Sequence, residues 1–168
     1  MKPIEIVTEP FTRIGIDTSG PFMKSQNGNV KIVVITDYTT KWTIAKAIPR
    51  ENSSTIAEII IGEVILQFGT PQVILSDANK VFRTEIMREL YMEFNSKHVA
   101  TTPYHPQTNG LTERFNKTLA GMLSMYINQK HRDWDQYIPY VVFAYNTVAQ
   151  DSTGQSPFYL LHGYQART

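Results

Sequence analysis

Three acidic residues stand where the sequence predicts the ends of structural elements. Asp17 lies near the end of a predicted strand, Asp77 ends another, and Glu113 lies near the start of a long predicted helix. In sheets with helical crossovers, sites gather where strand ends and loops meet. Carboxylate oxygens suit hard cations such as Mg²⁺ or Mn²⁺. The three residues therefore form a candidate metal site.

Glu113 also has a simpler interpretation. Its predicted helix carries an apolar stripe at steps of three and four residues: Leu111, Phe115, Leu119, Met122 and Tyr126. Glu113 faces away from this stripe, on the side of Asn116 and Lys117. A glutamate followed one turn later by a lysine is commonly a weak surface ion pair. Helical spacing alone favours that reading.

Other polar residues are better explained by structure than by chemistry. Asp37 is a conceivable fourth metal ligand, but Asp-x-Thr sequences favour side-chain-to-backbone turns, so we predict a turn. His98 and His105 have no partner at metal-ligand spacing. We expect both to be surface or loop residues.

The elements that must position the acids follow from hydrophobic periodicity. Strands are predicted over 11–17, 30–38 and 42–49, joined by short turns as an antiparallel meander. A helix capped by Asn52 or Ser53 and ended by Gly69 follows. The later elements are a strand over 72–77, a helix over 84–95, a strand over 98–103, and helices over 106–129, 134–149 and 156–162. This order predicts an α/β domain with a mixed five-stranded sheet, two of whose strands are parallel.

Composition limits the remaining classes. The chain has 168 residues, 42% of them hydrophobic, which fits a single domain. It has no cysteine, so disulfides and thiolate metal sites are excluded. No apolar run approaches a membrane span, and the N-terminus lacks a signal-peptide pattern. A net charge of only +1 means that any nucleic-acid binding must use a local patch or other domains.

Taken together, these segments resemble the catalytic core of retroviral and gypsy-type retrotransposon integrases. The resemblance is carried by IGIDTSGPF, ILSDANKVF and TPYHPQTNGLTERFNKTL, and later by WDQYIPYVVFAYNT and STGQSPFYLLHG. The 35 residues between Asp77 and Glu113 match the D,D-35-E spacing of that family. Three acidic residues alone would be weak evidence for this family, whereas this spacing between matching flanking segments is specific to it.

The resemblance implies a ribonuclease-H-like fold and a metal-dependent polynucleotidyl transferase and endonuclease. It would trim element DNA at the 3′ ends and join the new 3′-hydroxyls to target DNA. Such chemistry uses two Mg²⁺ or Mn²⁺ ions about 3.5–4 Å apart. By the same resemblance Asp17 would bridge both ions, with Asp77 on one and Glu113 on the other.

The resemblance also places a second set of residues beside DNA. These are Tyr104, Gln107, Asn109, Asn116 and Lys117. Lys117 suits a phosphate partner by charge. Loop packing is the alternative for Tyr104, and DNA contact is a lesser option for His105. Lys80, just after Asp77, could meet target DNA or simply be a solvated loop lysine.

Partners and location follow from the resemblance too. We expect DNA as substrate, no membrane, a nuclear location, and a homodimer or higher oligomer formed through the 106–129 and 134–149 helices. The whole chain, 1–168, would be one core domain with its core proper over about 8–163. The absence of a His/Cys zinc domain predicts an excised core or a host-derived remnant.

Two alternatives to an active integrase stay open. One is an integrase-derived domain kept for nucleic-acid or protein binding, with little catalysis. The other, a ribonuclease H, is disfavoured by the Pro-Gln-Thr-Asn-Gly loop. The integrase-derived binding domain is favoured by Asn79, because family members commonly carry glycine two residues after the second aspartate. Glycine allows positive φ, which asparagine tolerates better than most residues.

Overall fold

The sheet of this protein is mixed, with one antiparallel half and one parallel half. The computed structural model describes residues 9–101, 110–126 and 132–167, and for 110–113 and 124–126 only the backbone. The strands are β1 (Arg13–Ser19), β2 (Lys31–Asp37), β3 (Thr43–Ile48), β4 (Val73–Ser76) and β5 (Lys97–Ala100). Their order is β3-β2-β1-β4-β5, antiparallel among the first three and parallel from β1 to β5. This confirms the predicted five-stranded mixed sheet.

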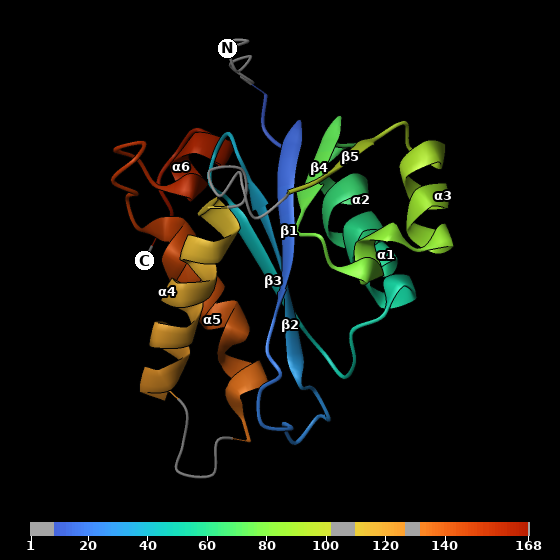
Figure 1. The fold of residues 1–168 in the computed structure, drawn as a ribbon. Helices are drawn as coiled ribbons and strands as arrows, with labels where there is room; N and C mark the ends of the chain where they lie inside the picture. The colour runs from blue at the N-terminus through green and yellow to red at the C-terminus, as the bar shows by residue number, and fades with distance from the viewer. Residues whose placement is uncertain (1–8, 102–109, 127–131, 168) are drawn as a thin grey trace.

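Helices cover both faces of the sheet (Figure 1). One layer holds α1 (Ser53–Ile60), the π-helical turn η1 (Ile61–Ile65), α2 (Leu66–Phe68), the 3₁₀ turn η2 (Lys80–Arg83) and α3 (Glu85–Glu93). The other layer holds α4 (Gly110–Tyr126) and α5 (Trp134–Thr147), and α6 (Pro157–His162) packs against α5. Within the described ranges, no helix is both long and apolar enough to cross a bilayer.

Alternation along the central strands builds two separate cores. Ile14 and Ile16 of β1 are fully buried in the core shared with α1 and α3. Ile32 and Val34 of β2 point to the opposite face, where they pack with Phe115 and other residues of α4 and α5. Because strand side chains alternate between faces, residues two apart share one core. This alternation sets which face of the sheet each polar residue of β1 can reach.

Capping residues explain several of the helix boundaries. Asn52 accepts a hydrogen bond from the Thr55 backbone N at 2.9 Å and so begins α1 as predicted. Gly69, with φ of 95°, ends the helical run at α2. The structure differs from the sequence prediction in the π turn, in the 3₁₀ turn after β4, and in the end of β1. Predicted helix residues 106–109 and 127–129 lie outside the described residues.

A long loop is tied to the start of α5 by one buried carboxylate. Oδ2 of Asp135 accepts hydrogen bonds from Ser25 Oγ at 2.6 Å, Asn29 Nδ2 at 2.7 Å and Asn27 Nδ2 at 3.1 Å. The neighbouring Trp134 indole donates to the Met23 carbonyl at 2.7 Å. Residues about 110 positions apart are thereby joined, so the loop between β1 and β2 is held against the α4–α5 layer.

Candidate active site

The two candidate aspartates lie side by side near the C-terminal ends of two neighbouring strands, β1 and β4. Ile16 of β1 pairs with Ser76 of β4 in parallel register, so Asp17 and Asp77 occupy the next position on neighbouring strands. Both side chains are partly exposed. β1 continues to Ser19, two residues beyond the predicted end, whereas β4 stops just before Asp77. Parallel pairing thus brings together two acids that are 60 positions apart in the sequence.

Helix α4 is bonded directly to the first aspartate. Asn116 Nδ2 donates to Asp17 Oδ2 at 2.9 Å, while Oδ1 of the same carboxylate accepts from the Thr18 backbone N at 2.8 Å. Glu113 lies on α4 one turn before Asn116. Residues three apart occupy one helical face. The backbone of α4 therefore brings position 113 to the face of the helix that meets Asp17, although the side chain of Glu113 lies outside the described atoms.

The turn after Asp77 is built differently from the expectation for Asn79. Asn79 has φ of −58°, so the left-handed conformation that glycine would favour does not occur there. Its backbone N donates to Asp77 Oδ1 at 3.1 Å, and its own Oδ1 accepts from the Val81 backbone N at 3.2 Å. These two bonds form consecutive side-chain-to-backbone turns. The asparagine thus supports the turn, which corrects the expectation that it stands in for a positive-φ glycine.

Glu51, which the sequence prediction missed, contacts the segments that carry both aspartates. Glu51 Oε1 accepts from Thr18 Oγ1 and, at 2.8 Å, from Asn79 Nδ2; Oε2 forms an ion pair with Lys31. Burial would raise the pKa of Glu51, but the hydrogen bonds from Lys31, Thr18 and Asn79 and the Lys31 charge hold it below its usual value. Glu51 follows β3, whose end lies at the same sheet edge as the ends of β1 and β4. The sequence signal that could have identified Glu51 is its position just after the third strand.

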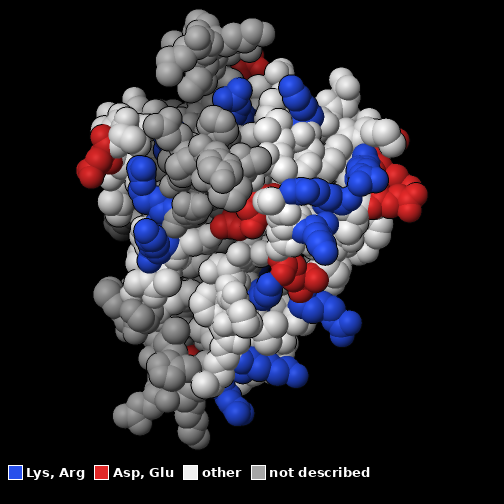
Figure 2. Space-filling model, in the orientation of Figure 1, with Lys and Arg blue, Asp and Glu red and all other residues white. Residues whose placement is uncertain are grey.

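The residues predicted to meet DNA are only partly placed. Lys80 begins the 3₁₀ turn after β4 and Lys117 lies on α4, and both are exposed. Asn116 is half-buried against Asp17. Tyr104, Gln107 and Asn109 lie outside the described residues. Among the described residues on the face shown in Figure 2, basic and acidic side chains lie interspersed, in keeping with the small net charge.

Two other polar residues are structural. Asp37 is fully buried, and its carboxylate accepts from the backbone N of Phe11 at 3.0 Å and of Thr40 at 2.9 Å, which confirms the predicted turn role. His98 is not the surface or loop residue that we expected. Its ring stacks on Tyr91 with centroids 4.6 Å apart and its Nε2 lies 2.9 Å from Ser76 Oγ, and burial lowers the pKa of His98.

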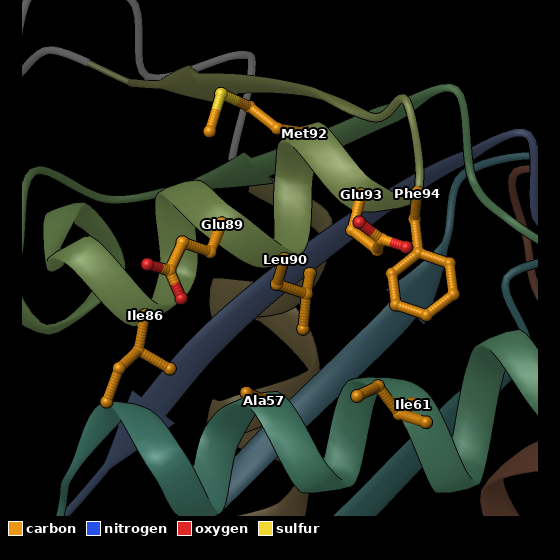
Figure 3. Close-up of a pocket in the computed structure, with 8 residues that line it drawn as sticks. All are labelled: Ala57, Ile61, Ile86, Glu89, Leu90, Met92, Glu93 and Phe94. Atoms are coloured by element: carbon orange, nitrogen blue, oxygen red, sulfur yellow. The ribbon is translucent and has the colours of Figure 1, made fainter.

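An apolar groove between α1 and α3 is separate from the acids. Figure 3 shows Ile86, Leu90 and Phe94 pointing toward α1, and Met92 of α3 also lines the groove. Two acids of α3 also line the groove. It lies on the sheet face opposite α4, so it plays no part in the site around Asp17.

The donor chemistry of the aspartates fits a divalent cation. Asp17 and Asp77 present only oxygen, from adjacent strands and with access to solvent. Hard oxygen donors are the ligands of Mg²⁺ and Mn²⁺. Among the side chains that the structure describes, no group of three acids and histidines gathers around one point. Glu113, the third member of the predicted set, is not among those side chains.

Solved structures share this fold. One neighbour is a chain from the structure of the simian T-cell lymphotropic virus intasome in complex with PP2A regulatory subunit B56 gamma. The two chains align at a TM-score of 0.81 with 20% sequence identity, and the alignment covers 98% of this chain and 59% of that chain. A second neighbour is the HTLV-2 integrase catalytic core domain in complex with magnesium, in its trimeric form. It aligns at a TM-score of 0.74 with 18% sequence identity, and the alignment covers 92% of this chain and 98% of that one. The fold is the ribonuclease-H-like fold of integrase catalytic cores.

Family comparison assigns the chain more narrowly. Residues 7–106 match the integrase core domain, a span that contains Asp17 and Asp77 and ends before Glu113. The chain belongs to the integrase core domain family. It is 30% identical over 164 residues to the retrovirus-related Pol polyprotein from transposon 412 of Drosophila melanogaster and 28% identical over 156 residues to gypsy retrotransposon integrase-like protein 1 of Rattus norvegicus. These alignments cover 96% and 93% of this chain but only 13% and 30% of those proteins.

Proposed function

We propose that the chain is the catalytic core of a DNA integrase, which trims element DNA at its 3′ ends and transfers those ends into target DNA. The observation that carries the proposal is the adjacency of Asp17 and Asp77 on parallel strands, with α4 bonded to Asp17 through Asn116. Membership of the integrase core family supports the reaction class. The 35-residue spacing to Glu113 supports its role as the third acid.

Asp17, Asp77 and Glu113 would hold the divalent ions, Mg²⁺ or Mn²⁺. Two ions bound there would activate the attacking oxygen and stabilise the leaving oxygen of an in-line displacement. The amide of Asn116 and the backbone N of Thr18 would keep the Asp17 carboxylate in one orientation during this step. The proposal gains support from a neighbour of the same fold that was solved with magnesium.

DNA binding is proposed to use a few placed cations rather than bulk charge. Lys80 begins the 3₁₀ turn that follows Asp77, and Lys117 lies on α4, the helix that carries Glu113. Both are exposed, so each could pair with a phosphate. Tyr104, Gln107 and Asn109 are proposed to lie beside the DNA end, as the family resemblance implies. Because chromosomal DNA would be the target, we place the activity in the nucleus.

A single substitution tests the proposed function. The chain is incubated with branched, pre-joined DNA and Mn²⁺, and Glu113→Gln is compared with wild type by release of the resolved strands. We expect Glu113→Gln to lower the rate by about a hundredfold or more, because a group acting on transition-state charge is removed. Glu89→Gln, an exposed glutamate on α3, is the matched control and should cut at the wild-type rate.

Two outcomes would contradict the catalytic role. Equal activity in wild type and Glu113→Gln would remove Glu113 from the site. No activity in either, with DNA still bound, would favour the alternative of an integrase-derived domain that binds without catalysis.

Pairing of two chains through α5 is also proposed. Tyr140 and Phe143, three residues apart on α5, are 72% and 49% exposed, and a hollow lined by β3 and α5 lies beside Phe143. Exposed aromatic side chains of this kind are enriched at interfaces. We expect a dimer mass in sedimentation velocity and a monomer mass for the double variant Tyr140→Ser, Phe143→Ser. A wild-type monomer at all concentrations tested would exclude this pairing.

A further inference from the structure

Glu51 lies at the centre of a chain of hydrogen bonds that joins the two aspartates. On one side, Thr18 donates its backbone N to Asp17 Oδ1 at 2.8 Å and its hydroxyl to Glu51 Oε1. On the other side, Asn79 donates its backbone N to Asp77 Oδ1 at 3.1 Å and its side-chain amide to Glu51 Oε1 at 2.8 Å. One oxygen of Glu51 therefore receives a bond from the residue that orients each aspartate.

The position of Glu51 indicates support rather than metal binding. Thr18 is opposite Val33 in the β1–β2 register, and Val33 packs in the core of α1 and α3, so Thr18 reaches Glu51 on the face opposite α4. Both oxygens of Glu51 are engaged by donors, Oε1 by two and Oε2 by Lys31. The Lys31 cation also offsets the charge that a further carboxylate would add beside two aspartates.

We propose that Glu51 is a positioning residue for the metal site: it holds the Thr18 and Asn79 segments together and so sets the spacing and orientation of the Asp17 and Asp77 carboxylates. The proposal rests on the proposed function, because it concerns the same site. It also gives Asn79 a role that glycine could not fill, since glycine has no side-chain amide to donate to Glu51.

Metal affinity measured by calorimetry with Mn²⁺ tests this directly. Glu51→Ala should raise the Mn²⁺ dissociation constant of the folded chain by about tenfold or more, as is usual when the partners of metal ligands are removed. Asn79→Gly should raise it less, because the Thr18–Glu51 bond remains. In the Glu51→Ala background the further change Asn79→Gly should have a smaller effect than it has alone, because the two side chains act through one shared bond.

A matched control separates positioning from general stability. Glu63 also pairs with a lysine, Lys46, at 2.8 Å, and this ion pair involves neither aspartate segment. Glu63→Ala should leave the Mn²⁺ dissociation constant unchanged. A purely structural role for Glu51 would lower the urea midpoint of unfolding without changing the Mn²⁺ affinity of the molecules that remain folded.

The outcomes distinguish this inference from the proposed function. Wild-type Mn²⁺ affinity in both Glu51→Ala and Asn79→Gly overturns the positioning role alone. If Glu51→Ala does not fold, unchanged affinity in Asn79→Gly overturns it by itself. A wild-type chain that binds no Mn²⁺ overturns the proposed function and this inference with it.

Discussion

Loss of Mn²⁺ binding, and with it all strand transfer, is the expected result of replacing Asp17 and Asp77 together by asparagine. Asp17 lies on β1 and Asp77 directly follows the paired strand β4, so the double change removes two anionic oxygen donors from one place. A neutral amide is a far weaker ligand for a hard divalent cation. Calorimetric titration with Mn²⁺ and with Mg²⁺ measures the loss, and circular dichroism checks that the chain is folded.

The matched control removes the same charge elsewhere. Asp151→Asn combined with Glu89→Gln changes two exposed acids and should titrate with Mn²⁺ as wild type does. The Asp17, Asp77 double variant should also be at least as stable as wild type without metal, because two neighbouring like charges are removed. Metal binding that survives in the double variant would show that the site lies elsewhere.

Removal of the Asp135 carboxylate, outside the site, is expected to destabilise the fold strongly. Asp135→Ala leaves three donors, from Ser25, Asn27 and Asn29, without their shared acceptor. Ser25 is buried, Asn29 is partly buried and Asn27 is exposed, so mainly the first two donors lose a partner that water cannot replace. An unsatisfied buried donor costs about 1–3 kcal/mol, and we expect a total loss of about 3 kcal/mol in the free energy of unfolding. Urea denaturation measures the change, and Asp151→Ala, at an exposed position, should change it little.

The same carboxylate makes stability depend on pH in a defined direction. Burial alone would raise the pKa of Asp135, but the bonds from Ser25, Asn29 and Asn27 hold it below its ordinary value of 3.8. A lowered folded pKa stabilises above the unfolded value, and this contribution disappears as the pH falls below 3.8 and through the folded pKa. As the pH falls below about 4, the free energy of unfolding of Asp135→Asn should therefore decrease less than that of wild type. An equal acid loss in both would contradict this assignment.

Much of the fold was predictable because its signals are local. Alternating apolar residues marked β1, a β-branched apolar run marked β2, and caps such as Asn52 and Gly69 marked the first long helical run. The strand order and the mixed pairing followed from which connections were short turns and which contained helices. The 3₁₀ turn after β4 was not predicted. It is capped by the side chain of Asn79, whereas the sequence had suggested that Asn79 adopts a positive φ in place of glycine.

The sequence by itself determined which acids are candidates and that Asp17 and Asp77 lie near the ends of strands. It could not determine that they share one position across a parallel pair, because that register depends on β1 and β4 meeting in space. Nor could it reveal Glu51, whose partners Thr18 and Asn79 lie 33 and 28 residues away with no periodicity to connect them. Hydrogen bonds between distant loops depend on where the packed sheet brings strand ends together. Only the tertiary structure therefore decided how the two aspartates are held.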